Sequence, residues 1–226
     1  VMPTLQNPTN AVMSQDRRRD IVEVARRHDL LVVEDDVYGY LMAERPLPIA
    51  ALAPERTIYV TSASKCLAPG LRVAWVAAPT NLRPQLAEAA RITTVTQPAV
   101  MGAIASQWIL EGRAETLLQW QRREIAARFK IARQALDGLD WRGHPSAFHV
   151  MLHLPPPWTG DVFAAAARQA GITIQPISAF DAGADYAGQA VRITLTQVAD
   201  HDILAEALST LRRILGRGPN WPRAVI

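Results

Sequence analysis

The sequence predicts an α/β protein whose sheet is covered by helices on both faces. Short, continuously apolar segments alternate with helical patterns through the first third of the chain, which is typical of strands buried on both sides. The middle of the chain is mainly helical, and short strands return from about residue 148. The length fits one large domain or two small ones, and the long helical segment at 115–138 is suited to bridging two domains.

The first half of the chain contains the strands of the predicted sheet and one well-marked helix. Ser14 has the residue type of an N-cap and predicts a helix that runs to about His28, with Ile21, Val22 and Ala25 on its apolar face. The expected strands are the strand end at Val1-Met2 and the segments 30–33, 57–61 and 73–77.

The second half is expected to be helical first and mixed afterwards. Gly171 is a suitable residue to follow a helix C-terminus, and the prolines at 155–157 break the strand before them. The expected helices cover 81–93, 98–111, 115–138, 161–170 and 200–215. The expected strands cover 148–154, 172–174 and 191–195.

Composition excludes several function classes. The 226 residues are 49% hydrophobic, enough for a packed core, and the net charge is only +3. The arginines are spread out, and the densest run, Arg17-Arg18-Arg19, is interpreted as a solvated helix face rather than a nucleic-acid footprint. Cys66 is the only cysteine, so a cytoplasmic setting fits. No apolar stretch reaches about 18 residues, so we expect no membrane span.

Lys65 is the residue that most strongly suggests chemistry. It is one of only two lysines, the other being Lys130, in a chain whose other basic residues are all arginine. A primary amine can form a Schiff base with an aldehyde, whereas a guanidinium cannot. Lys65 ends the segment Tyr59-Val60-Thr61-Ser62-Ala63-Ser64-Lys65, directly after an apolar strand.

Three further segments accompany Lys65, and each is weak by itself. They are Gln6-Asn7-Pro8-Thr9-Asn10, Glu34-Asp35-Asp36-Val37-Tyr38 and Val191-Arg192-Ile193-Thr194, with Pro69-Gly70-Leu71-Arg72 following the lysine. The acidic cluster at 34–36 has the ligand type of a hard cation. No matching second ligand cluster appears in the sequence, so we expect no metal.

In this order and spacing, the segments resemble fold-type I pyridoxal-phosphate (PLP) proteins, the aspartate aminotransferase superfamily. The resemblance implies a mixed, mostly parallel sheet. It implies that 1–124 is the latter part of the large PLP-binding domain and that 125–226 is the small α+β C-terminal domain. It also implies that an N-terminal part, including a Gly-rich turn at the phosphate, is missing upstream of Val1.

The resemblance implies a role for each matching residue. Lys65 would form the Schiff base with PLP and move the substrate proton, and Asp35 would pair with the pyridine nitrogen because of its spacing to Tyr38. Tyr38 and Asn7 would bind the phenolic oxygen of the ring. Ser62, Ser64 and Arg72 would bind the phosphate, and Arg192 the substrate carboxylate. Asn10 stands where the family usually has Gly, a mild change because Asn tolerates the left-handed conformation.

A closer resemblance is to MocR-type regulators of the GntR family, in which an aminotransferase-like domain follows a winged helix. The segments 59–65, 148–152 and 154–158 carry it. It implies an effector-sensing domain, homodimeric when intact, that takes an amino acid or 2-oxo acid. DNA would be bound only through a domain absent from this chain. The alternatives are a free-standing PLP-dependent aminotransferase and a truncated, inactive remnant.

Overall fold

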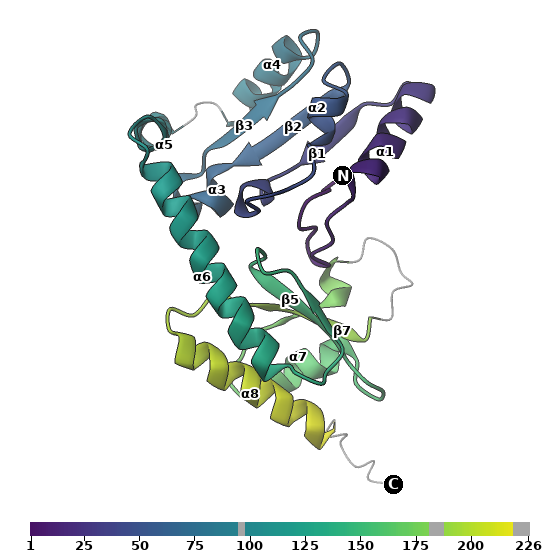
Figure 1. The fold of residues 1–226 in the computed structure, drawn as a ribbon, viewed down its shortest axis with the longest axis vertical. Helices are drawn as coiled ribbons and strands as arrows, with labels where there is room; N and C mark the ends of the chain where they lie inside the picture. Colours follow the sequence, from purple (N-terminus) through teal and green to yellow (C-terminus); the bar gives the residue numbers. More distant parts are fainter. Residues whose placement is uncertain (95–97, 181–187, 219–226) are drawn as a thin grey trace. The chain divides into compact units, whose positions relative to one another are not determined.

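The computed structural model describes residues 1–94, 98–180 and 188–218, and the chain divides into two compact units (Figure 1). The first unit comprises residues 1–6 and 11–123, and the second comprises residues 7–10 and 124–226. Each unit has its own sheet. The α/β fold class predicted from the sequence is confirmed.

The sheet of the first unit has the strand order β1-β2-β3. Strands β1 (Val32–Asp35) and β2 (Thr57–Ser62) are parallel, whereas β3 (Ala74–Ala77) runs antiparallel to β2. The predicted strands at 30–33, 57–61 and 73–77 are therefore present, shifted by one or two residues. The expected strand end at Val1-Met2 is not a strand, although the Val1 carbonyl accepts the Asp35 N–H at 2.9 Å.

Helix α1 (Gln15–Arg27) covers this sheet as its sequence pattern predicts. The Ser14 Oγ accepts the Arg17 N–H at 3.2 Å, which is the expected N-cap. Val22 and Ala25 are buried and form a small core with Val32 of β1 and with α2 (Ile49–Leu52).

Arg18 corrects the prediction of a solvated face at Arg17-Arg18-Arg19, because it is fully buried. Arg18 precedes Val22 by four residues and Ala25 by seven, so it lies on the apolar stripe of α1. Its guanidinium donates to the carbonyl oxygens of Pro3, Met13 and Leu47 and to the Thr4 hydroxyl. Burial is possible because each donor has an acceptor.

The remaining helices of the first half also follow the sequence pattern. Helices expected at 81–93, 98–111 and 115–138 are present as α4 (Arg83–Thr94), α5 (Ala99–Leu110) and α6 (Arg113–Ala135). Four short elements were not predicted: η1 (Gly39–Leu41), α2 (Ile49–Leu52), α3 (Ala63–Cys66) and η2 (Pro69–Leu71). Among the described helices, none is both long and apolar enough to cross a membrane.

The second unit is built on a four-stranded antiparallel sheet. Its order is β4-β5-β7-β6, formed by β4 (Trp141–Gly143), β5 (His149–His153), β6 (Gln175–Pro176) and β7 (Ala190–Thr194). Helices α7 (Gly160–Gln169) and α8 (His201–Arg217) pack on one face of this sheet, where alternate strand residues enter the core. A short 3-10 helix, η3 (Ile177–Phe180), follows β6.

The predicted strand at 172–174 is wrong. Gly171 adopts φ +79°, and the next amide, that of Ile172, donates to the Ala167 carbonyl at 2.9 Å, so this segment completes the C-terminal cap of α7. Strand pairing begins only at Gln175. The other expected elements of this unit are confirmed. Asp200, expected as the first residue of the last helix, is instead the N-cap of α8, and its side chain accepts the Asp202 N–H at 2.6 Å.

Arg128 links α6 to the loop between β7 and α8. Its side chain is 6% exposed and donates to the carbonyl oxygens of Leu195, Val198 and Ala199. It also forms an ion pair with Glu124 at 2.7 Å, and the other partner of Glu124 is His201 at 2.8 Å. One guanidinium therefore donates to three loop carbonyl oxygens.

We expect Arg128→Met to lower the free energy of unfolding by about 3 kcal/mol, because it removes several hydrogen bonds to buried acceptors. Urea denaturation measures this loss. Arg133→Met is the matched control, since Arg133 lies exposed on the same helix. A loss of similar size in both variants would contradict the role given to Arg128.

Glu124 makes the stability of this unit sensitive to acid. Hydrogen bonds from His201 and Arg128 lower the pKa of Glu124 below its ordinary value of 4.5. A lowered carboxyl pKa stabilises the fold above the unfolded-state pKa, and this stabilisation disappears as the pH falls through the lower folded-state pKa. We expect Glu124→Gln to reduce the fall in unfolding free energy below pH 4.5. Glu115→Gln, an exposed change on α6, should leave that fall unaltered.

Candidate functional site

The residues predicted to form the site fall into two groups, one in each unit. The first unit holds Asp35, Tyr38, Ser62, Ser64, Lys65 and Arg72. The second unit holds Asn7 and Arg192.

Lys65 lies where β2 ends and α3 begins. Ser62 is the last residue of β2 and the N-cap of α3, and Lys65 lies within this single helical turn. The half-buried lysine places its Nζ 5.8 Å from the centroid of the Tyr38 ring. Tyr38 is itself only 8% exposed and follows β1. Because β1 and β2 are parallel neighbours, their carboxyl ends meet at one edge of the sheet.

The two neighbouring aspartates at this edge have different environments. Asp36 is completely buried, and its Oδ2 accepts the Tyr59 hydroxyl at 2.7 Å and a bond from the Arg45 guanidinium. Asp35 is half-buried, and its Oδ1 accepts the Val37 N–H at 3.2 Å. Asp35 is therefore the aspartate that retains access to a ligand at the end of β1.

Arg72, Ser62 and Ser64 lie on the segments that follow β2. Arg72 is exposed and adopts the left-handed conformation, with φ +51°, directly after η2. The Ala63 N–H donates to the Val73 carbonyl at 2.9 Å, which fastens the start of α3 to the residue after Arg72. The half-buried hydroxyl groups of Ser62 and Ser64 and the exposed guanidinium of Arg72 thus lie on two segments that this hydrogen bond joins.

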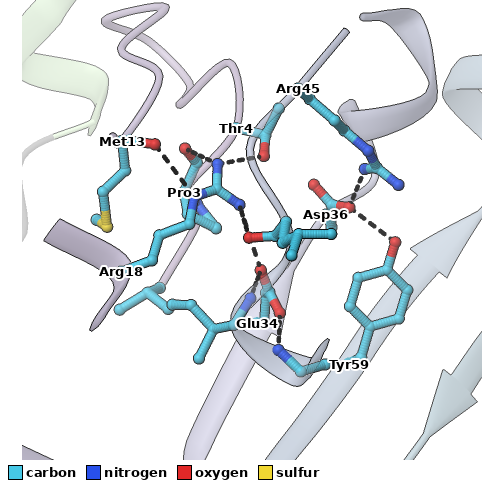
Figure 2. A network of polar contacts seen from close by, with 12 residues as sticks. Pro3, Thr4, Met13, Arg18, Glu34, Asp36, Arg45 and Tyr59 are labelled. Atoms are coloured by element: carbon cyan, nitrogen blue, oxygen red, sulfur yellow. Dashed lines mark hydrogen bonds and ion pairs between the residues drawn. The ribbon is translucent and has the colours of Figure 1, made fainter. Parts of the chain in front are cut away.

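Sequence reasoning missed a buried polar network beneath this edge, which Figure 2 shows. The Glu34 carboxylate accepts the N–H groups of Ile49 and Ala50 at 2.9 and 2.8 Å and lies 3.8 Å from Arg18. Burial raises the pKa of Glu34 and lowers the pKa of Arg18. The cost of removing both charges from water therefore exceeds their mutual attraction, and the additional hydrogen bonds offset part of this cost.

Asp36, Arg45 and Tyr59 form the second part of this network (Figure 2). Burial, followed by the hydrogen bond to Asp36, raises the pKa of the Tyr59 hydroxyl, which remains a protonated donor. A sequence signal for the network existed. Glu34 and Asp36 are two residues apart after Val32, so they share the face of the strand that turns toward the core.

In the second unit, Arg192 and Asn7 are joined directly. The Arg192 Nη1 donates to Asn7 Oδ1 at 3.0 Å, and its guanidinium lies 4.7 Å from the Phe180 ring centroid. Arg192 alternates with the core residues Val191 and Ile193, so its side chain leaves the opposite face of the sheet.

Asn10 attaches the segment 7–10 to the same sheet. Its Nδ2 donates to the His149 carbonyl of β5 at 2.9 Å, and its φ is +60°. This agrees with the expectation that an asparagine replaces glycine here, because asparagine tolerates the left-handed region. The segment is therefore bound to the sheet of the second unit through β5 and, by way of Asn7, through β7.

The donor set of the first unit fits a cofactor with an aldehyde, a basic ring nitrogen and a phosphate. Lys65 supplies a primary amine, Asp35 an accessible carboxylate, and Arg72 a cation with a fork of donors. The serine hydroxyls at the start of α3 add neutral donors. These groups match the chemistry of such a molecule without requiring a metal.

The conformation of Arg72 allows a test that separates backbone strain from charge. We expect Arg72→Gly to be more stable than Arg72→Ala by about 1 kcal/mol, because glycine has no steric penalty at positive φ. Both variants remove the guanidinium equally. Urea denaturation of the pair gives the difference, and equal stabilities would contradict the left-handed geometry at this residue.

Comparison with known proteins places the chain among two kinds of relative. It is 28% identical over 216 residues to the uncharacterized HTH-type transcriptional regulator YdeF of Bacillus subtilis, covering 95% of this chain and 46% of that protein. It is 28% identical over 210 residues to aromatic-amino-acid aminotransferase 1 of Thermococcus litoralis, covering 89% and 50%. The chain spans about half the length of the curated relatives it matches.

A solved structure and a family model agree with this placement. Pyrococcus horikoshii kynurenine aminotransferase, solved in complex with PMP, superposes with a TM-score of 0.85 at 27% identity, over 96% of this chain and 55% of that one. The predicted fold-type I architecture is confirmed. The model of the family described as aminotransferase class I and II matches residues 1–208. The chain therefore belongs to the aminotransferase class I and II family.

Proposed function

We propose that this chain is the PLP-binding, effector-sensing part of a MocR-like transcriptional regulator, with the cofactor attached covalently to Lys65. One observation carries the proposal. In a chain of this family, the Lys65 Nζ lies 5.8 Å from the Tyr38 ring at the strand edge that also bears Asp35. An amine beside an aromatic ring and an accessible carboxylate suits an aldehyde cofactor with a basic nitrogen.

Each remaining residue has a proposed contact. Asp35 pairs with the ring nitrogen and keeps it protonated, so that the bound cofactor acts as an electron sink. The contacts of the other residues follow from their donor types. Tyr38 and Asn7 bind the phenolic oxygen, Ser62, Ser64 and Arg72 the phosphate, and Arg192 the carboxylate of the ligand. The hydrogen bond from Arg192 to Asn7 supports the last role, since it holds the guanidinium in a fixed position.

Both a regulatory and an enzymatic role have support among the relatives. YdeF is named an uncharacterized HTH-type transcriptional regulator, whereas the Thermococcus litoralis relative is named an aminotransferase. The first alternative is therefore a free-standing aminotransferase that moves amino groups between amino acids and 2-oxo acids. A truncated, inactive remnant is the second alternative. The MocR-like segments at 59–65, 148–152 and 154–158 favour the regulator.

The proposed setting of the whole protein follows from the same resemblance. We propose a cytoplasmic homodimer that binds an amino acid or a 2-oxo acid and contacts DNA only through a domain outside these residues. Residues 1–124 are proposed as the latter part of the large PLP-binding domain, and 125–226 as the small domain.

The test is covalent labelling of the full-length protein with PLP and borohydride, followed by peptide mapping. We expect the label on Lys65 and its loss in Lys65→Ala, because borohydride reduces an imine to a stable amine bond. Lys130→Ala is the matched control, since Lys130 is the other lysine and lies exposed on α6.

The outcomes of this experiment separate the alternatives. A label that persists in Lys65→Ala would contradict the assignment of Lys65. A label on Lys65 accompanied by steady amino-acid turnover would favour the enzyme over the regulator. The complete absence of a label in the unmodified protein would favour the inactive remnant.

A further inference from the structure

We propose that Asp36, Arg45 and Tyr59, named here the Asp36 brace, position Asp35 for the cofactor. The brace residues lie on the opposite side of the strand end and touch no ligand in this scheme. They are positioning residues that act through Asp35. The inference rests on the proposed function, because it concerns how that same site is held.

The first observation is that Asp35 lies between two immobilised carboxylates. Glu34 and Asp36 are both completely buried, and both are held by hydrogen bonds from other segments of the chain (Figure 2). Glu34 binds the N-terminus of α2, and Asp36 binds Tyr59 of β2. Because alternate residues of an extended strand point to opposite faces, fixing 34 and 36 fixes the direction in which Asp35 points.

The second observation concerns the turn that carries Tyr38. The Gly39 N–H donates to the Asp36 carbonyl at 3.0 Å, which closes the turn. A Cβ atom added at Gly39 would overlap Arg45 Nη1 and the Asp36 carboxylate. The Asp36–Arg45 ion pair therefore occupies the space that a side chain at residue 39, next to Tyr38, would need. The position of the ion pair and the backbone path of the turn thus constrain each other.

The negative charge of Asp36 is compensated by the positive charge of Arg45. Asp36 is buried, and the Arg45 side chain is only 20% exposed. Removing one partner would leave a buried charge with fewer hydrogen bonds, so the segment would shift rather than keep its geometry. Asp35 needs little movement to lose its function, because a catalytic or binding group must lie within about 0.5 Å of its productive position.

A purely structural role for the brace makes a different prediction from a positioning role. If the brace only stabilises the fold, its loss should weaken cofactor binding by the same factor whether or not Asp35 is present. If it acts through Asp35, its loss should matter only while Asp35 has its carboxylate. A double-mutant cycle distinguishes these cases.

The experiment measures the Kd for PLP by absorbance titration of the full-length protein. Tyr59→Phe removes one hydroxyl from the brace, and we expect about tenfold weaker binding. In the Asp35→Asn background, the same change should weaken binding by less than about twofold. Tyr40→Phe is the matched control, because Tyr40 lies half-exposed in the adjacent turn and keeps the ring that Arg45 contacts. Equal losses in both backgrounds would overturn the proposal.

A second measurement does not depend on the cofactor. We expect the amide hydrogens of residues 35–39 to exchange about tenfold faster in Tyr59→Phe than in the unmodified protein, both without PLP. Gly39→Ala should have the same effect, because its methyl group displaces the ion pair from the other side. Unchanged exchange in both variants would overturn the brace.

The two measurements also separate this proposal from the proposed function. If the unmodified protein does not bind PLP, the proposed function is wrong and the brace has no cofactor to serve. If the unmodified protein binds PLP and Tyr59→Phe binds it equally well, the brace proposal is wrong and the proposed function stands.

Discussion

The parallel pairing of β1 with β2 is the constraint on which the candidate site depends. Val32 lies opposite Thr57, and Asp35 opposite Val60, so both strands end at the same edge of the sheet. Parallel strands place their carboxyl ends together, and residues that follow two such strands become neighbours although they are distant in sequence. Lys65 and Tyr38 meet for this reason. A one-residue change in the register of β1 would move the Asp35 side chain to the other face of the sheet and remove its carboxylate from the candidate site.

Buried charges maintain this arrangement, and each is accompanied by hydrogen bonds. Arg18 with Glu34 fastens the N-terminal segment and α2 to the sheet, whereas Asp36 with Arg45 and Tyr59 fastens the turn after β1. Arg128 has the corresponding role in the second unit. Such pairs contribute little net stability compared with apolar packing. They join segments that are distant in sequence, and a binding site requires such support from its surroundings.

The division of the site residues between the units has a chemical logic. The first unit carries the amine, the carboxylate and the phosphate-type donors, all of which suit the cofactor. The second unit carries Arg192, which suits a carboxylate of a ligand, and Asn7, which Arg192 binds. In the proposed scheme, the first unit supplies most of the cofactor contacts, whereas the second supplies the contact to the ligand carboxylate and the Asn7 contact to the phenolic oxygen. The relatives are named both as regulators and as enzymes, which is consistent with one fold that carries different functions.

The sequence by itself determined the fold class and most helices and strands, and it identified Lys65 as the candidate Schiff-base residue. These features depend on local patterns: the apolar stripe of α1, the short apolar strands, and one lysine among many arginines. Only the tertiary structure showed that Arg18 is buried and that Asp36 accepts a hydrogen bond from Tyr59, whereas Asp35 is accessible. It also showed that the segment 172–174 follows the cap of a helix instead of forming a strand. The physical reason is that these outcomes depend on partners far away in the chain, such as Tyr59 for Asp36. Periodicity identifies which face of an element is buried, but it does not identify the residue on the opposite side of the contact.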